Sequence, residues 1–394
     1  MRRRRGKRRA FQWLSLVTAS AACACLLSMQ LPAASSTSGG LEFDAPSGLA
    51  FGGGHLWVTN EAGNSVTEIN PASGAWIATL ATSGDGFDRP AALTSFGADL
   101  FVANAGGSVS ELLASDGSLV RVISGPAFHF VDPVAIEAIG STIFVLNAGS
   151  PSGAGSITEL DALTGGLVRT VSGARFAFRD PVALDASGPD VFVADRGNNA
   201  VTEVSRANGG LIRVIARQGL SAPDGITSSG GRIWVSDSGS NAATEIDRAS
   251  GRVLATFTDS DGGYGFGSPS VAIASGGNIF IASPFGSSPM VTKVSASSGK
   301  PSWYMCNTNG PYYFSLLSAF ALRGGRLWVA SRSGANSKTP GASTGSLTEL
   351  STGNGALITT LPTPQQSAPT TTTSTIPSST TTSTSTSTTT TSLP

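Results

Sequence analysis

A short apolar run in which an aromatic residue precedes an aliphatic one returns seven times, and this repeat restricts the fold more than any other feature. Successive copies are 44, 43, 48, 42, 46 and 48 residues apart. The seven pairs are Trp57-Val58, Phe101-Val102, Phe144-Val145, Phe192-Val193, Trp234-Val235, Phe280-Ile281 and Trp328-Val329. Near-equal copies at this period indicate one supersecondary unit repeated along the chain.

Each copy follows the same internal plan. The first six copies open with a proline and the seventh with a leucine: Pro46, Pro90, Pro133, Pro181, Pro223, Pro269 and Leu317. Four short apolar runs follow, separated by turns rich in Gly, Asn and Ser; in the fourth copy they include residues 182–184, 192–193, 201–204 and 211–215. Short β-branched and aromatic runs between turn residues are typical of strands, and none has helical periodicity.

Four strands in about 45 residues make one antiparallel blade, and seven blades in a ring can bury each other's faces. The sequence therefore predicts an all-β, seven-bladed β-propeller of four-stranded antiparallel blades. The repeats begin in phase near Pro46 and end in phase at residues 357–361, which predicts no strand swap at ring closure. The expected blades are near 43–84, 85–125, 126–173, 174–216, 217–258, 259–305 and 306–364.

The two ends of the chain have other roles. Residues 1–34 have the basic start, apolar stretch and small residues of an export signal. Export through the twin-arginine route at Arg8-Arg9, an uncleaved anchor, and lipid attachment at Cys23 are alternatives. Residues 35–42 are expected to be a short linker. Residues 365–394 are almost entirely Thr, Ser and Pro, which predicts a disordered tail.

Charge limits the partners. Seven of the 25 basic residues lie among the first nine positions, before any acidic residue, so the remaining chain carries a net charge of −7. A domain of this sign repels phosphate backbones, which excludes nucleic acid as the expected partner. Membrane association is expected only through an N-terminal anchor. Cys306 is the one cysteine outside the leader, so the domain cannot form an intrachain disulfide.

Two stretches carry a family resemblance. Residues 193–201, Val-Ala-Asp-Arg-Gly-Asn-Asn-Ala-Val, resemble an NHL repeat, and residues 57–66 resemble the YVTN-type repeat of bacterial and archaeal surface proteins. The resemblance implies a propeller related to peptide- and protein-binding modules, streptogramin-type lyases and gluconolactonase-like hydrolases. Copies six and seven depart from it, with Ser283 and Ser331 where other copies have Asn or Asp. It assigns no functional residue.

Four sets of residues are candidates for particular roles. Acidic residues beside the blade-opening proline are weak candidates for a cation site: Asp44, Asp88, Asp132, Asp180 and Asp224. Aromatic residues in the last blade connection are candidates either for a binding surface or for core packing: Tyr312, Tyr313 and Phe314. The residues that end the second strand are expected to bond backbone amides of the following turn: Asn60, Asn104, Asn147, Asp195 and Asp237. Three Glu–Arg pairs ten residues apart predict cross-strand ion pairs: Glu111–Arg121, Glu159–Arg169 and Glu203–Arg213.

The leading functional hypothesis is an exported or cell-surface, non-enzymatic binding module, acting as a monomer on an unknown protein, peptide or glycan. Its loops would carry specificity, above all residues 149–156, 259–267 and 306–314. One alternative is a metal-dependent lyase or lactone hydrolase with its site at the propeller channel and a divalent cation as cofactor. Another is a structural surface-layer component. No catalytic residue stands out, and His55 and His129 belong to no spaced ligand motif.

Overall fold

A computed structural model describes residues 43–150, 154–216, 219–261, 263–285, 288–307, 312, 314–332 and 345–361. The chain divides into two units, Met1–Ser35 and Ser36–Pro394, and all described residues lie in the second. The expected export signal, linker and tail, and the candidate Tyr313, lie outside the described residues. No helix among the described residues is long and apolar enough to cross a membrane.

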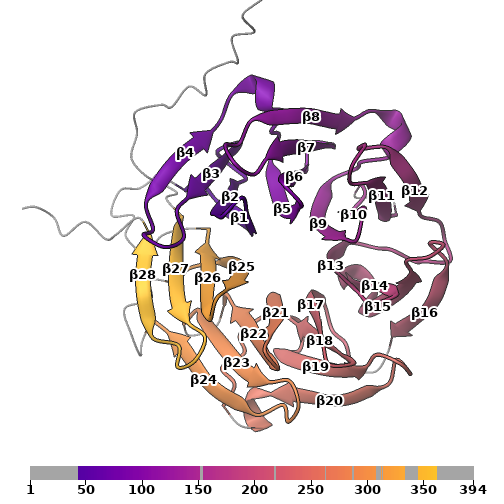
Figure 1. Ribbon diagram of the computed structural model, residues 1–394. Helices are drawn as coiled ribbons and strands as arrows, with labels where there is room; N and C mark the ends of the chain where they lie inside the picture. The colour runs from indigo at the N-terminus through magenta and orange to yellow at the C-terminus, as the bar shows by residue number, and fades with distance from the viewer. Residues whose placement is uncertain are drawn as a thin grey trace, which may run out of the picture. The chain divides into compact units, whose positions relative to one another are not determined.

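Seven four-stranded antiparallel sheets surround a central channel and form a seven-bladed β-propeller (Figure 1), as predicted. Blade one contains β1 (Pro46–Gly52), β2 (His55–Asn60), β3 (Ser65–Ile69) and β4 (Trp76–Leu80). Blade two contains β5 (Pro90–Phe96), β6 (Asp99–Asn104), β7 (Ser108–Leu113) and β8 (Leu119–Ser124). Blade three contains β9 (Pro133–Ile139), β10 (Thr142–Asn147), β11 (Ser156–Asp161) and β12 (Leu167–Val171).

The remaining blades repeat this order from the channel outward. Blade four contains β13 (Pro181–Ser187), β14 (Asp190–Asp195), β15 (Ala200–Ser205) and β16 (Leu211–Ala216). Blade five contains β17 (Pro223–Ser229), β18 (Arg232–Asp237), β19 (Ala242–Asp247) and β20 (Val253–Thr258). Blade six contains β21 (Val271–Ser275), β22 (Asn278–Ser283), β23 (Met290–Ser295) and β24 (Pro301–Cys306). Blade seven contains β25 (Leu317–Arg323), β26 (Arg326–Ser331), β27 (Ser346–Ser351) and β28 (Leu357–Leu361).

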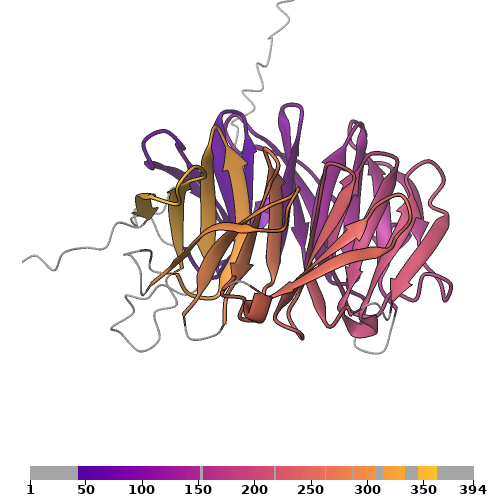
Figure 2. The same cartoon turned by 90° about the horizontal axis from the view of Figure 1, so that it is seen from below.

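Seen from the side, the strands run through the thickness of the ring and the turns gather at its two faces (Figure 2). Short 3-10 helices occur in connections: η1 (Ser83–Asp85), η2 (Pro126–Phe128), η3 (Arg196–Asn198) and η4 (Asp259–Asp261). The loops that join one blade to the next and those between the second and third strands share one face. We call this the loop face, and it carries the channel mouth described below.

The core lies between the blades. The seven landmark aromatic residues are at most 1% exposed, and they contribute to the hydrophobic clusters in the core: Trp57, Phe101, Phe144, Phe192, Trp234, Phe280 and Trp328. The inner strands approach closely, since a Cβ added to Gly225 would lie 2.5 Å from the carbonyl oxygen of Ser270 in the next blade. This packing explains why the second strand is apolar on both faces.

The ring closes without a shared strand, which confirms the prediction, because every sheet contains four consecutive strands. A hydrophobic cluster joins blades one and seven instead, with Leu56 and Val58 against Trp328 and Leu347. The Ser318 hydroxyl donates a 2.6 Å hydrogen bond to the carbonyl oxygen of Pro46. Ser47 makes the equivalent bond, 2.7 Å, to Pro90 in blade two. The closing junction is therefore built like an ordinary one.

The residue before each blade-opening position has a left-handed backbone, with φ between 44° and 56°. The seven residues are Ala45, Arg89, Asp132, Asp180, Ala222, Ser268 and Leu316. In three junctions an Asn side chain of the preceding blade accepts the amide hydrogen of this residue: Asn64 from Arg89, Asn199 from Ala222 and Asn241 from Ser268. A left-handed non-glycine residue is strained, so these bonds help hold the loop face rigid.

The Asn/Asp series has the structural role expected of it, but its partners differ from the prediction. Asn104 and Asp195 accept amide hydrogens from residues sixteen positions earlier, Asp88 and Arg179, rather than from the following turn. Asp237 does the same with Ser221. The earlier loop lies beside the end of the second strand because the first two strands are antiparallel. These three residues therefore fix the loops that enter blades two, four and five.

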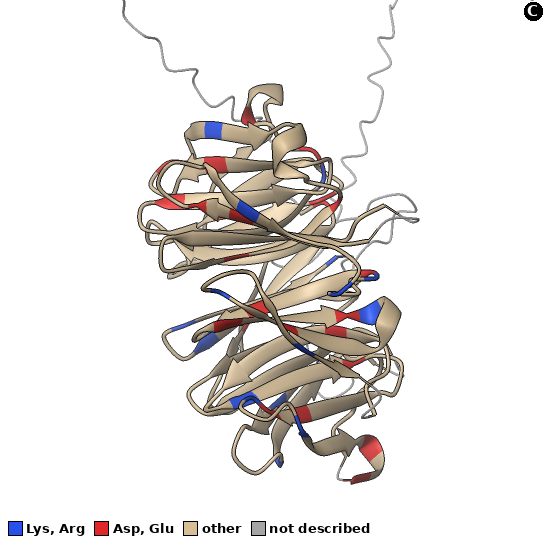
Figure 3. Ribbon diagram, turned by 90° about the vertical axis from the view of Figure 1, so that its right-hand side faces the viewer, with Lys and Arg blue, Asp and Glu red and all other residues tan. Residues whose placement is uncertain are grey.

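The three cross-strand ion pairs are confirmed. Glu111 faces Arg121 at 2.5 Å, Glu159 faces Arg169 at 2.8 Å, and Glu203 pairs with Arg213. The arginines also bond carbonyl oxygens in the next blade; Arg213 reaches Arg248 and Ala249. Each pair therefore links two blades as well as two strands. On the side of the ring in Figure 3, acidic and basic residues are interspersed.

Candidate functional site

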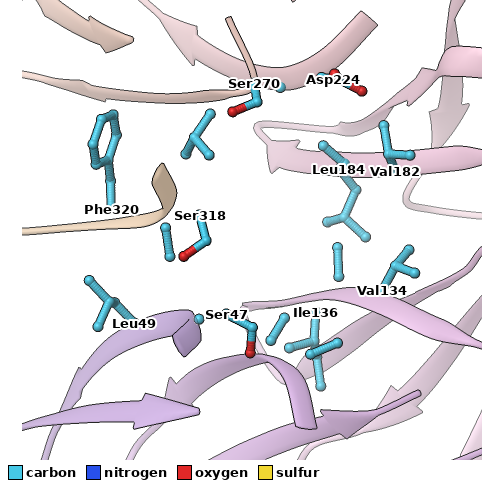
Figure 4. Close-up of a pocket in the computed structure, with 18 of the residues that line it drawn as sticks. Ser47, Leu49, Val134, Ile136, Val182, Leu184, Asp224, Ser270, Ser318 and Phe320 are labelled. Atoms are coloured by element: carbon cyan, nitrogen blue, oxygen red, sulfur yellow. The ribbon is translucent and has the colours of Figure 1, made fainter. Parts of the chain in front are cut away.

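A cavity of about 1080 Å³ occupies the channel, and all seven inner strands line it. Figure 4 shows side chains from several of these strands around the open centre, among them Ser47, Leu49, Ile136 and Leu184. Most of the labelled side chains are apolar; the exceptions are three serines and Asp224. Such a concave apolar space with a few polar groups is the usual form of a ligand site.

One layer of the wall consists of the residues that pair with the aliphatic landmark residue of the second strand. Six of them are large: Leu49, Leu93, Ile136, Leu184, Ile226 and Phe320. Blade six has Ala272 at this position, opposite Ile281. All seven line the cavity. The layer therefore has one small residue, Ala272 in blade six, and we call this position the gap.

Charged residues surround the mouth of the cavity on the loop face. Each comes from the loop before an inner strand, from its start, or from just after a second strand: Glu61, Arg89, Asp132, Arg196, Asp224 and Arg332. They join in ion pairs that each cross a blade junction: Arg332 with Glu61, Arg89 with Asp132 at 3.9 Å, and Arg196 with Asp224 at 2.6 Å. Asp180 also lies 3.7 Å from Arg196.

These charges alternate in sign around the ring. From blade one to blade five the order is acidic, basic, acidic, basic, acidic, and blade seven is basic. Seven positions cannot alternate without a break, because seven is odd. The break falls in blade six, where Pro284 and Phe285 line the cavity and Phe285 is 56% exposed. The mouth is thus a rim of mixed charge with one aromatic interruption.

Two carboxyl groups lie deeper in the channel, at equivalent positions of β9 and β13. Glu137 accepts the amide hydrogen of Ala186 at 2.7 Å. Asp185 accepts the amide and hydroxyl hydrogens of Ser228, both at 2.9 Å. Burial, and secondarily the charge of Asp185, raise the pKa of Glu137 to about 7. These groups tie the inner strands of blades three, four and five together.

The five predicted acidic candidates do not form one cluster. Asp132 and Asp224 line the mouth, where arginines pair with them, whereas Asp44, Asp88 and Asp180 do not line the cavity. In the described part of the chain, no three His, Cys, Asp or Glu residues are arranged to hold a metal ion. Sequence reasoning named these two rim residues only as weak candidates for a cation site and did not foresee their ion pairs.

The predicted aromatic candidates lie in the core where they are described. Tyr312 is 7% exposed and Phe314 is 1% exposed, and both belong to the cluster between blades six and seven. Their rings stack 5.4 Å apart. They offer no exposed surface here, which agrees with the core-packing alternative. Sequence analysis missed Phe285, although four of the other copies have Gly at the equivalent turn position and the difference is visible in the sequence.

Neither histidine lines the channel cavity. His55 pairs with Glu68 inside blade one, and His129 lies exposed in the connection after η2. Cys306 is buried at the end of β24.

A second surface runs around the outer strands, where apolar residues of neighbouring blades are exposed, including Val120, Val168 and Ile212.

Comparison with solved structures reveals the same fold elsewhere. Hydrazine synthase of Kuenenia stuttgartiensis matches with a TM-score of 0.59 and 18% identity, over 75% of this chain and 95% of that one. A catalytically inactive virginiamycin B lyase from Staphylococcus aureus, with quinupristin, matches with 0.57 and 14%, over 73% and 92%. The computationally designed Ika8 protein matches with 0.56 and 14%, over 82% and 88%. The sequence matches no protein-family profile and no curated protein.

At these identities the likeness shows the fold alone. The fold of the lyase neighbours is the propeller fold that the NHL and YVTN resemblance implied. What those proteins bind or convert is their own property.

Proposed function

We propose that the chain is an exported, non-enzymatic binding module that holds a peptide segment of a partner protein at the channel mouth. The single observation that carries this proposal is the apolar cavity of about 1080 Å³, which opens through a rim of alternating charge. The rim and the wall come from all seven blades, so a ligand there contacts a rigid ring rather than one mobile loop.

The chemistry of the mouth favours a peptide over other ligands. A purely anionic ligand would meet acidic residues such as Asp132 and Asp224, and a purely cationic one would meet Arg196 and Arg332. A peptide with side chains of both signs complements such a rim, and a large apolar side chain fits the aliphatic wall beneath. Mixed-charge complementarity fixes register and excludes wrong partners more than it adds affinity.

The test begins with a library of random twelve-residue peptides displayed on phage and selected on the purified full-length protein. Enriched peptides, made synthetically, are titrated against Ala91→Cys protein before and after labelling with a bulky maleimide. Ala91 lines the cavity, so the label should abolish binding. The control is Ser302→Cys on the exposed outer strand β24, where the label should change nothing. Enriched peptides that bind the labelled Ala91→Cys protein equally well would overturn the proposal.

Export is tested separately. The basic and apolar pattern of residues 1–34 supports removal of a leader near residue 34. Expression in a bacterial host should yield a secreted form whose N-terminus, measured by mass spectrometry, lies near residue 35. A protein that keeps Met1 and remains in the cytoplasmic fraction would contradict this part of the proposal.

A further inference from the structure

We propose that the blade-six sector of the mouth, Phe285 above the gap at Ala272, is the specificity pocket for a large aromatic or aliphatic side chain of the bound peptide. This inference rests on the proposed function and deepens it. It assigns the anchor of the ligand to one blade of seven. Three independent features of blade six support it.

The first feature is the pattern of ion pairs. They join blades seven and one, two and three, and four and five. Each pair neutralises two rim positions and holds their side chains against each other. Blade six is the remaining blade, and its rim residues, Pro284 and Phe285, are apolar. This sector is therefore the part of the rim that an apolar group can cross without displacing a charged pair.

The second feature concerns one backbone hydrogen bond that recurs in several blades, in which blade six has its glycine at the other end of the bond. In four blades a glycine after the second strand donates its amide hydrogen to a residue eighteen positions earlier: Gly106 to Asp88, Gly149 to Val131, Gly197 to Arg179 and Gly239 to Ser221. A Cβ on Gly197 would lie 2.3 Å from the Arg179 carbonyl oxygen, so that side of the bond excludes a side chain.

Blade six makes the same bond in the same direction, but the glycine is the acceptor instead of the donor residue. Phe285 donates to Gly267 at 3.2 Å, compared with 2.8 Å for Gly197 to Arg179. The glycine has moved to the connecting loop, and a phenylalanine occupies the cavity side. Pro284 before it is buried and fixes its own φ, which steadies the position of the exposed ring. With glycine in the connecting loop, the Phe285 ring is accommodated at the mouth of the cavity.

The third feature is the wall below. Ala272 stands where the other blades have Leu, Ile or Phe, two residues further from the mouth than Ser270. Ala272 thus lacks the bulk that Leu, Ile or Phe places in the other blades, and Val271 and Ile273 on either side of it also line the cavity. An exposed aromatic ring that lines an apolar cavity is the arrangement of a binding hot spot, where aromatic contacts add to the area buried.

The test uses the enriched synthetic peptides and four variants of the full-length protein. Phe285→Ala should weaken binding of peptides with an aromatic anchor by about tenfold or more. Ala272→Leu restores the residue type found in other blades, so the fold should tolerate it while the filled gap weakens binding similarly. Leu163→Ala and Val120→Ala, which remove side chains that are 72% and 45% exposed on the outside of the ring, should leave affinity unchanged.

Thermal unfolding of each variant separates binding from folding. Phe285 is exposed, so Phe285→Ala should keep the wild-type midpoint. A second readout replaces Phe285 with Trp, which should preserve binding and show a fluorescence change when the peptide is added. Peptides that enter the channel, as judged by the labelled Ala91→Cys protein, yet bind Phe285→Ala and Ala272→Leu as tightly as wild type, would overturn this inference and leave the proposed function intact. Peptides that bind irrespective of the Ala91 label would overturn both.

Discussion

Asp237 occupies a position that carries a titratable carboxyl in some blades and a neutral amide in others. It ends β18, is fully buried, and accepts the amide hydrogen of Ser221 and the hydroxyl hydrogen of Thr244. Burial raises the pKa of its carboxyl to about 7. Blades one to three have Asn at this position, and the uncharged Asn104 accepts the amide hydrogen of Asp88 and donates to the hydroxyl of Ser110. Asn is therefore an isosteric replacement for Asp237 that the repeat itself already uses.

We predict that Asp237→Asn stabilises the protein at pH 8 by about 1 kcal/mol and has little effect at pH 4. The pKa of this carboxyl is higher in the folded than in the unfolded protein. The stability that the protonated carboxyl contributes is therefore complete below the unfolded-state pKa. It is lost as pH rises through about 7. Asparagine removes that loss. Urea unfolding at both pH values measures the difference.

The reverse change is the matched control. Asn104→Asp should destabilise the protein at pH 8 and be nearly neutral at pH 4, because the same buried position then acquires a titrating carboxyl. Equal effects of either substitution at both pH values would show that burial of charge does not govern this position.

At the scale of the element, the third and fourth strands are joined by their Glu–Arg pairs. Glu203 is 2% exposed, and Arg213 bonds it together with two carbonyl oxygens of the next blade. Removing the arginine leaves a buried carboxylate without its cation, which costs more than losing an exposed pair.

We predict that Arg213→Met lowers the free energy of unfolding by roughly 2 kcal/mol. Arg252→Met, at an exposed position in the turn of blade five, should change it by less than about 0.5 kcal/mol. Chemical denaturation measures both. Similar values for the two variants would mean that the pair contributes no more than a surface charge.

The sequence predicted the elements and these pairs because both depend on residues close together in the chain. Glu203 and Arg213 are ten positions apart, and a hairpin of known period places them opposite each other. Asp195 was predicted to bond its following turn, and the structure assigns it a partner sixteen positions earlier. That partner depends on the loop entering the blade, whose path the local pattern does not specify.

At the scale of the whole molecule, the site exists only once the ring is closed. Arg332 and Glu61 are 271 positions apart and meet at the junction of the last and first blades. No local pattern connects them, so sequence reasoning found the acidic series but not the alternating rim. The sequence shows Phe285 in place of a glycine, but its place at the mouth, opposite Gly267 and above Ala272, depends on the closed ring.

The closing junction should be as strong as any other. Ser318→Ala and Ser47→Ala each remove one inter-blade hydrogen bond at equivalent positions, so each should cost about 1 kcal/mol. Unfolding of both variants should remain a single transition. A much larger cost for Ser318→Ala, or a second transition confined to that variant, would identify the junction as a weak seam.

Photo-cross-linking shows directly where the peptide binds: an enriched peptide carries a benzophenone side chain at its apolar anchor, and mass spectrometry locates the attachment site. Attachment should occur at the channel mouth, in residues 267–273 and 283–285 above all. Attachment to the outer strands instead, around the exposed Val120, Val168 and Ile212, would show that the channel mouth does not bind the peptide and would make the outer strands the binding surface.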